Sequence, residues 1–504
     1  MSLAIVHARA SVGIDAPLIS VEVHLANGLP AFNIVGLPEA SVREAKERVR
    51  SALINSHFEF PAKRITVNLA PADLPKEGGR FDLAIAVGII AASGVFPADT
   101  LDKFEVIGEL GLSGDIRPVS GALPFTYACH HAKRIAIIPQ DNLQEASLID
   151  EVKLAPVRYL SEVIQVLVGQ KSISVTQART QSTAAKYPMD LQDVVGQMAA
   201  KRALEVAASG AHNLLFFGPP GTGKTMLAHR LVTILPPMND AEALETAAIK
   251  SICGQKVSPD NWHQRPYRYP HHTSSAVALV GGGSHPKPGE ISLAHNGILF
   301  LDELPEFSRK VLDVLREPLE AGQVSISRAS RQAVFPAKFQ LVAAMNPSPT
   351  GAADDKRSTP DQVLRYLSRL SGPFLDRIDL QVEVPALPHH QFEQQITQRG
   401  ESSQVIRQRV IACRERQTAR SGVVNAQLNS KQIEQYCELE PSDRIFLQKA
   451  VQHLGLSIRT YHRVLKVART LADLDMEEQI TQRHLSEALS YRGLDRLVSR
   501  LTQC

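Results

Sequence analysis

A glycine-rich loop constrains this chain more than any other feature of its sequence. Residues 218–225 read GPPGTGKT, between an apolar run at 213–217 and a helical pattern that starts at Lys224. In a loop of this composition the glycines let backbone N–H groups surround a phosphate, the lysine adds positive charge, and the final hydroxyl can bind Mg²⁺. The positive end of the helix that follows faces the same anion. The pattern predicts a nucleotide-phosphate site built from Gly218, Pro219, Pro220, Gly221, Thr222, Gly223, Lys224 and Thr225.

A second motif supplies the acids that such a site needs. Residues 298–303 read ILFLDE, an apolar strand that ends in Asp302 and Glu303. Two carboxylates at the end of a buried strand are costly unless they reach a functional edge. We expect Asp302, with Thr225, to hold Mg²⁺, and Glu303 to polarise the attacking water. No guanine-reading NKxD motif is present, so the sequence favours ATP as the nucleotide.

The order of strands and helices predicts an α/β protein with several parts. Residues 1–170 alternate short strands with helices, and residues 171–189 form a polar stretch without acids that we interpret as a linker. Residues 190–390 alternate apolar strands with helices, which is typical of a parallel sheet covered on both faces. Residues 391–504 have helical patterns throughout. The prediction is a P-loop core with a parallel sheet and a helical lid, preceded by an α+β domain.

Composition excludes several classes of protein. The net charge of +3 permits a nucleic-acid partner without arguing for one. The five cysteines form no CxxC pair, so neither a disulfide framework nor a cysteine-rich zinc site is expected. Residues 1–17 lack the basic and then apolar order of a signal peptide, and no uncharged apolar run reaches the roughly 20 residues of a membrane span. We therefore expect a cytoplasmic protein that does not enter a membrane.

Two adjacent histidines, His271 and His272, raise the question of a metal site. Adjacent side chains on a strand point to opposite faces, so we do not expect these two to bind one ion. The alternative is a metal site completed by His263, His285 and His295. The sequence favours no zinc here, and we interpret the segment as an insert near the nucleotide or a pore.

Three later segments resemble motifs of AAA+ ATPases. Asn346 lies in AAMNP, directly after a strand, and resembles a sensor 1 residue that contacts the γ-phosphate or its water. Arg377 lies in SGPFLDRID, which resembles the arginine-finger segment of the helix-2-insert clade and implies contact with the ATP of a neighbouring subunit. Arg459 lies in LSIR, which resembles sensor 2.

Longer segments resemble the magnesium-chelatase-like AAA+ family and are spread over most of the chain. The resemblance implies an ATP- and Mg²⁺-dependent motor that acts on single-stranded and branched DNA as a homo-hexamer. It further implies a branch-migration helicase that aids the integration of donor DNA during natural transformation. The segments are residues 32–53, 64–89, 269–275, 289–307, 370–380 and 457–474.

The same resemblance suggests how the chain contacts DNA. Residues 323–336 have the pattern of a hairpin before the sensor 1 strand, and in the resembling clade this hairpin projects into the ring channel. We expect Arg328 and Arg331 at its tip to bind DNA phosphates; the alternative is a solvated turn. Family members often carry cysteines after the sensor 1 Asn-Pro, but residues 346–379 contain none, so no metal is predicted there.

The first domain resembles the Lon protease domain without its catalytic residues. Arg80 stands where Lon has its nucleophilic serine, and Leu123 falls about where Lon has its catalytic lysine. A Ser–Lys dyad needs a hydroxyl beside a deprotonable amine, so we expect no proteolysis. Two alternatives to a DNA motor stay open: a Lon-like ATP-dependent protease, opposed by the missing dyad, and an ATP-driven chelatase-like subunit that remodels a partner.

Overall fold

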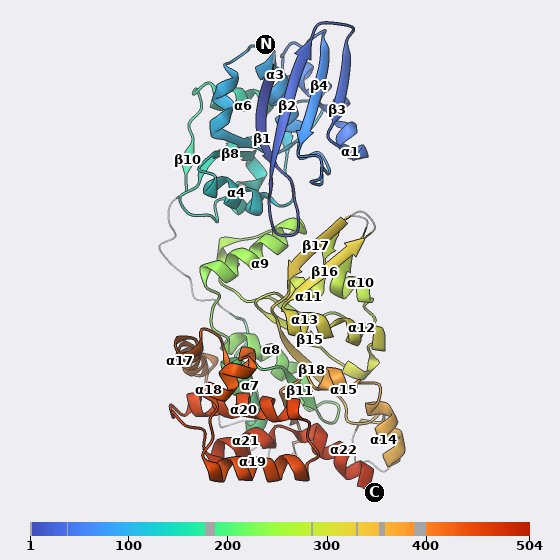
Figure 1. Cartoon of the computed structure of the whole chain (residues 1–504), viewed down its shortest axis with the longest axis vertical. Coiled ribbons are helices and arrows are strands. Elements are labelled where there is room, and N and C mark those ends of the chain that lie inside the picture. The colour runs from blue at the N-terminus through green and yellow to red at the C-terminus, as the bar shows by residue number, and fades with distance from the viewer. Residues whose placement is uncertain are drawn as a thin grey trace. The chain divides into compact units, whose positions relative to one another are not determined.

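The computed structural model describes residues 3–37, 39–176, 187–283, 286–328, 331–351, 358–387 and 400–503. These residues divide into two compact units, each of which can be followed in Figure 1. Unit 1 contains Met1–Ala184 together with Asp240–His263 and Ser327–Phe335, and unit 2 contains the remainder of the chain. The predicted fold class is confirmed: an α+β sheet domain, a parallel sheet core and a helical C-terminal region.

Unit 1 is built on a mixed eight-stranded sheet. In spatial order its strands are β10 (Ser174–Val175), β9 (Lys153–Val157), β8 (Ile135–Pro139), β5 (Phe104–Val106), β1 (Leu3–Arg9), β2 (Leu18–Ala26), β4 (Arg64–Ala70) and β3 (Ala31–Val35). The β1, β2 and β4 strands pair antiparallel, and the β5, β8 and β9 strands run parallel to β1. Alternate residues of β1, β2 and β4 are buried, as expected for strands with one face against a core.

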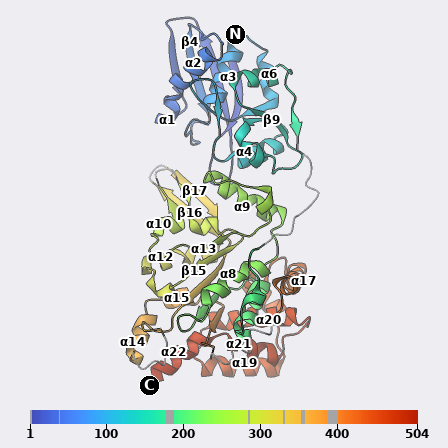
Figure 2. The same cartoon turned by 180° about the vertical axis from the view of Figure 1, so that it is seen from behind.

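The core of unit 1 forms around the apolar helix α3 (Asp82–Ala92). Every residue from Asp82 to Ala91 is buried, which is typical of a helix that is hydrophobic on all sides. The α3 helix packs on β1 and β2 and on α2 (Ala45–Asn55), as Figure 2 shows from behind. Gly88 permits the close approach, because a Cβ atom there would lie 2.5 Å from Val23 Cγ2.

One expectation for the first domain changes in detail. A short hairpin is formed by β6 (Glu109–Leu110) and β7 (Ile116–Arg117). The β10 strand, which the sequence analysis assigned to the linker, pairs with β9 at the edge of the sheet. The acid-free stretch at 177–186 lies outside the described residues.

One helix from the middle of the chain, α9 (Asp240–Ile252), belongs to unit 1. It packs on α4 (Ala122–His131), and Gly121 N donates a hydrogen bond to Ser251 O at 3.0 Å. By its position in sequence we assigned this segment to residues 190–390. Helical periodicity shows that a helix has an apolar face, but it does not show which sheet or helix covers that face.

Unit 2 contains the predicted parallel sheet. In spatial order its strands are β12 (Tyr267–Arg268), β15 (Ile298–Leu301), β18 (Gln340–Met345), β11 (Leu214–Phe217) and β19 (Leu380–Glu383). All neighbouring pairs run parallel. The continuous apolar runs of β11, β15 and β18 are fully buried, as expected for a sheet covered on both faces. In such sheets ligands bind outside the carboxyl ends of the strands, which is where the glycine-rich loop follows β11.

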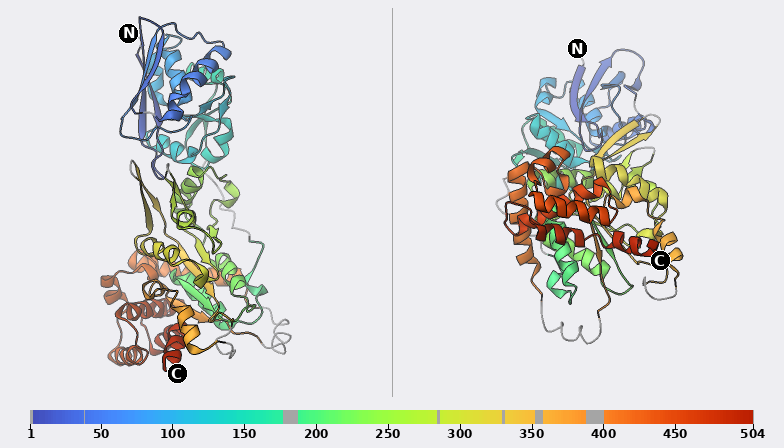
Figure 3. Two further views of the ribbon diagram at one scale, coloured as in Figure 1. Left: turned by 90° about the vertical axis from the view of Figure 1, so that its right-hand side faces the viewer. Right: turned by 60° about the horizontal axis from the view of Figure 1, so that its bottom comes forward.

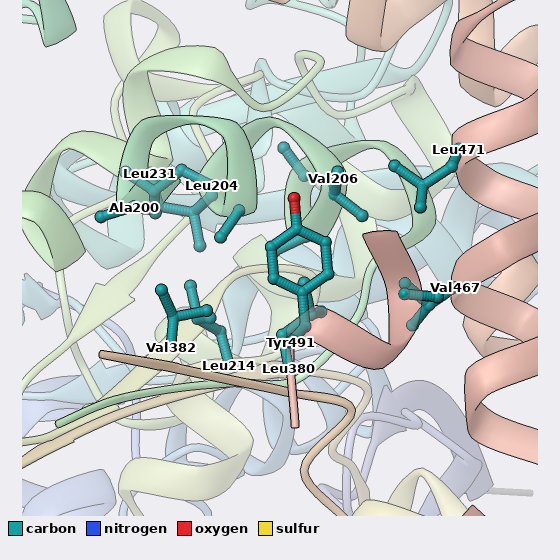
Figure 4. Packing of buried hydrophobic residues seen from close by; sticks show 14 of the residues in the cluster. Ala200, Leu204, Val206, Leu214, Leu231, Leu380, Val382, Val467, Leu471 and Tyr491 are labelled. Carbon is teal, nitrogen blue, oxygen red and sulfur yellow. The ribbon is translucent and has the colours of Figure 1, made fainter. Parts of the chain in front are cut away.

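The main core of unit 2 joins the sheet to the helices that cover it. Figure 4 shows Leu204 of α7 (Met198–Gly210) and Leu231 of α8 (Lys224–Ile234) gathered with Leu214 and Val382 of the sheet. Val467 of the C-terminal region lies in the same cluster, so the helical region and the sheet share one core.

The C-terminal region of unit 2 is helical, as predicted, and is drawn in orange to red in Figure 3. Its helices are α17 (Ser403–Ser421), α18 (Ser430–Tyr436), α19 (Pro441–His453), α20 (Ile458–Leu474), α21 (Gln482–Ser490) and α22 (Gly493–Gln503). Within the described ranges no helix is long and apolar enough to cross a membrane.

The predicted hairpin is present as β16 (Gln323–Arg328) and β17 (Arg331–Pro336), which form a two-stranded sheet. Residues 329–330 and the side chains of Arg328 and Arg331 lie outside what the structure describes, so the predicted DNA contacts of these two arginines stay a prediction.

Candidate nucleotide site

The glycine-rich loop connects β11 to α8, as the sequence predicts. Gly218 lies against β19's continuation, where a Cβ atom would be 2.2 Å from Val384 O, so no other residue fits there. Gly221 and Gly223 have φ angles of +76° and +88°, in the left-handed region that glycine adopts without strain. Each glycine therefore has a steric reason: a close contact at Gly218, and a positive φ angle at Gly221 and Gly223. Together they leave the loop backbone free to curve around a phosphate.

Lys224 lies at the centre of this loop and is 8% exposed. Its Nζ atom donates hydrogen bonds to Gly218 O and Pro219 O, both at 2.7 Å, and to Asn346 Oδ1 at 3.1 Å. Burial lowers the pKa of Lys224, and the Asp302 carboxylate acts in the opposite direction. The predicted sensor 1 residue and the phosphate-binding lysine are thus brought together from β18 and α8.

The two predicted metal ligands also meet. Thr225 Oγ1 donates a hydrogen bond to Asp302 Oδ2 at 2.7 Å, across the gap between α8 and the end of β15. A hydroxyl and a carboxylate oxygen are ligands that Mg²⁺ accepts, usually alongside water and nucleotide phosphates. This pair therefore fits the cofactor implied for the site. Within the described ranges, no group of three or more His, Cys, Asp or Glu side chains is gathered where it could hold a metal ion.

Glu303 follows Asp302 in a turn with an unusual backbone. Its φ angle is +52°, in the left-handed region that is costly for a residue with a Cβ atom. Its N–H group donates to Asp302 Oδ1 at 2.9 Å, which stabilises the turn. Backbone conformations of this kind in a non-glycine residue persist where the surroundings enforce them, and they are common at functional sites.

Two neighbours of the acids were missed in the sequence. Tyr269 OH donates to Asp302 Oδ2 at 3.3 Å, and His272 Nδ1 lies 3.1 Å from Glu303 Oε2. The pairing of β12 with β15 brings the two segments together, because Arg268 pairs with Leu299 and the two chains leave the sheet next to each other. Counted from that pair, His272 is opposite Glu303.

The expectation that His271 and His272 point to opposite sides is wrong. Their ring centroids lie 4.1 Å apart, with an angle of 33° between the planes. The reason is that β12 ends at Arg268, so the alternation of a strand no longer applies. His271 Nδ1 is instead paired with Thr273 Oγ1 at 2.8 Å.

Arg377 is not part of this cluster. It lies before β19, where Asn213 Nδ2 donates to its carbonyl oxygen at 2.8 Å, at the amino edge of the sheet. The glycine-rich loop lies at the carboxyl edge, after β11, whose four residues run parallel to β19. At about 3.3 Å per residue the two edges are separated by about 13 Å.

The surroundings of Arg377 show which other groups share its edge. Its guanidinium pairs with Glu320 and with Pro373 O. Burial lowers the pKa of Arg377, the Glu320 carboxylate raises it, and repulsion from Arg316, Arg463 and Arg459 lowers it further. Arg459 is exposed in the first turn of α20 and is close enough to Arg377 to lower its pKa.

Comparisons with known proteins agree with this geometry. The family described as "Magnesium chelatase, subunit ChlI" matches residues 190–392, "Subunit ChlI of Mg-chelatase" matches 21–142, and "Magnesium chelatase, subunit ChlI C-terminal" matches 400–492. The chain is 56% identical to competence protein ComM of Haemophilus influenzae over all of both chains. It is 52% identical to the uncharacterized protein YifB of Escherichia coli over 99% of each chain. A magnesium-chelatase 38 kDa subunit of Cereibacter sphaeroides is 27% identical over 32% of this chain and 54% of its own. The chain belongs to the magnesium-chelatase ChlI family of AAA+ ATPases, a class that uses ATP and Mg²⁺.

Proposed function

We propose that this protein is an ATP-dependent DNA motor that works as a homo-hexamer and drives branch migration during the integration of donor DNA. The observation that carries the proposal is the division of the predicted ATPase residues between two edges of one sheet. Lys224, Thr225 and Asp302 meet at the carboxyl edge, while Arg377 lies at the amino edge. Such a division makes sense if one copy supplies the phosphate site and the next copy supplies the arginine.

Each residue then has a defined part in hydrolysis. Lys224 and the loop N–H groups bind the β- and γ-phosphates, and Asn346 orients the γ-phosphate or the water. Thr225 and Asp302 hold Mg²⁺, whose charge offsets that of the phosphates. Glu303 polarises the attacking water. Arg377, with Arg459 beside it, reaches the ATP of the adjacent copy and offsets the charge that develops during transfer.

The identity to a competence protein along the whole chain favours work on DNA over chelation. A chelatase-like remodelling subunit is the second candidate, because the matching family carries that description. Against it, the 38 kDa chelatase relative covers only 32% of this chain. The deciding experiment measures ATPase stimulation by four-way DNA, by a chelatase partner and by casein, followed by branch migration on the four-way substrate. Stimulation by the chelatase partner alone would favour the second candidate, and degradation of casein would favour a protease.

The hairpin offers a test of DNA contact. Arg328→Ala combined with Arg331→Ala should weaken binding to all DNA sequences similarly, because phosphate contacts carry no sequence information. The slope of log affinity against log salt should flatten by about 0.7–0.9 per lost contact. Ring formation and basal ATPase should persist. Lys431→Ala with Arg444→Ala, which removes two exposed charges from α18 and α19, is the matched control. Normal DNA binding and unwinding by the hairpin variant would indicate that the hairpin tip is a solvated turn without DNA contacts.

His272 offers a test of how Glu303 is oriented. A contact of this kind between partly exposed side chains is worth about 0.2–1 kcal/mol, so His272→Ala should lower kcat by about 1.5–5-fold. The KM for ATP should change little, since His272 contacts Glu303 and not the loop. His271→Ala is the matched control, because His271 pairs with Thr273. Equal losses in the two variants would contradict a specific effect on Glu303.

A further inference from the structure

Unit 1 contains a cation that none of the described residues neutralises. Arg80 lies directly before α3, and its Nε atom has neither solvent contact nor a hydrogen-bond partner. Burial lowers the pKa of Arg80 to about 10, and no carboxylate among the described residues opposes that shift. The residue as a whole is only partly buried, so its outer nitrogens can still contact water while Nε cannot.

Two acids at the first turns of α3 and α4 bind other groups. Asp82, in the first turn of α3, accepts a hydrogen bond from Arg48 Nε at 2.7 Å. Glu145 Oε1 accepts from Leu123 N at 3.1 Å, in the first turn of α4. Neither of these two acids is paired with Arg80, so its outer nitrogens can bind a group from outside the chain.

The groups that Arg80 does face are suited to an anion. A Cβ atom added to Gly121 would lie 4.0 Å from Arg80 Nη2, 3.9 Å from Ser11 Oγ and 3.9 Å from Ile252 Cγ1, so two polar groups and one apolar side chain border the same space. Gly121 has a φ angle of +76° and precedes α4. The Leu123 N–H is taken by Glu145, so Arg80 and Ser11 are the donors available there.

We propose that Arg80 and Ser11 form an oxyanion site in unit 1 that binds a phosphate group. A guanidinium presents paired N–H donors whose geometry matches two oxygens of a phosphate, and a serine hydroxyl can donate to a third. The phosphate comes either from the phosphodiester backbone of a nucleic acid or from free inorganic phosphate. The site is separate from the nucleotide site of unit 2, so a result that contradicts this site would not contradict the proposed ATPase.

The test uses the full chain with Lys224→Ala, which removes phosphate binding by the glycine-rich loop. Thermal unfolding is followed as inorganic phosphate replaces chloride at constant ionic strength, with and without Arg80→Met. Phosphate at ten times its dissociation constant should raise the midpoint of unit 1 by roughly 3–6 °C when Arg80 is present. Arg80→Met should abolish that rise and, without phosphate, should unfold no earlier than its parent, because it removes an unpaired charge.

Two further variants keep the outcome decisive. Arg64→Met removes an exposed arginine from β4 and should leave the phosphate response unchanged. Arg80→Lys keeps the charge but loses the paired donors, so it should need about tenfold more phosphate for the same rise. If Arg80→Met does not fold, the phosphate response of Arg80→Lys tests the site instead. An equal phosphate response in all variants, or earlier unfolding of Arg80→Met with no phosphate response in its parent, would overturn the site.

Hydrogen exchange identifies the source of the phosphate. A short oligodeoxynucleotide and its uncharged methylphosphonate counterpart are compared for protection of α3 and the start of α4. Protection by the phosphodiester alone, lost in Arg80→Met, assigns the site to nucleic acid. Protection by inorganic phosphate but not by the oligonucleotide assigns it to a small anion. No protection by either removes the proposal.

Discussion

Glu303→Gln should bind ATP and Mg²⁺ normally but hydrolyse ATP at least about 10²-fold more slowly. The amide keeps the size of the side chain and cannot accept a proton from water. Binding should survive because the contacts that we assign to the phosphates and Mg²⁺ come from Lys224, Thr225 and Asp302. Single-turnover hydrolysis and nucleotide titration measure the two properties separately.

Two control variants show whether the loss of hydrolysis is specific to Glu303. Lys224→Ala should lose nucleotide binding as well as hydrolysis, since its ammonium group lies at the centre of the loop. Glu306→Gln removes an acid only three residues further on, which pairs with Arg369 at 3.2 Å, and should hydrolyse ATP almost normally. Near-normal turnover in Glu303→Gln would remove the assignment of Glu303 as the group that activates water.

Mixing two inactive variants should restore ATPase activity. In a ring whose sites are shared, a subunit with Arg377→Ala keeps an intact phosphate site, and a subunit with Glu303→Gln keeps an intact arginine. At equal mixing about a quarter of the interfaces combine both intact halves, so activity should approach about a quarter of that of the unmodified ring. The in-chain separation of Arg377 from the loop is the structural reason to expect this.

The matched control mixes Glu303→Gln with Lys224→Ala. Both changes disable the same half of a shared site, so no interface becomes complete and no activity should return. Mass spectrometry of the assemblies confirms that the rings are mixed. Failure of the Arg377→Ala mixture across all ratios, in rings shown to be mixed, would contradict a shared site.

The sequence predicted those parts of the site that depend on short-range chemistry. The loop at 218–225 needs glycines, a lysine and a hydroxyl in a fixed order, so its place between β11 and α8 followed from local pattern alone. The position of Asp302 and Glu303 at the end of an apolar strand was likewise predicted from local pattern alone. Asn346 was found through resemblance, and the structure places it 3.1 Å from Lys224.

The contacts that were missed depend on pairing between distant segments. The β12 strand has two residues, too few for any periodicity, yet its register with β15 sets His272 beside Glu303. The side-chain alternation used for His271 and His272 assumed a strand that has already ended. The unpartnered state of Arg80 likewise needs knowledge of every group around it, which no local pattern supplies.

The packing of α9 on α4 has a consequence for how this protein can be shortened. A truncated chain that starts at residue 190, after the polar stretch, would keep α9 but lose the surface that covers it. The side chains then exposed to water would be mostly small and apolar, which favours unfolding of the helix or aggregation. An isolated ATPase therefore requires a second excision that replaces Asp240–His263 with a short connection. The residues at risk are Ala243, Thr246, Ala247, Ala248, Ile249 and Ser251.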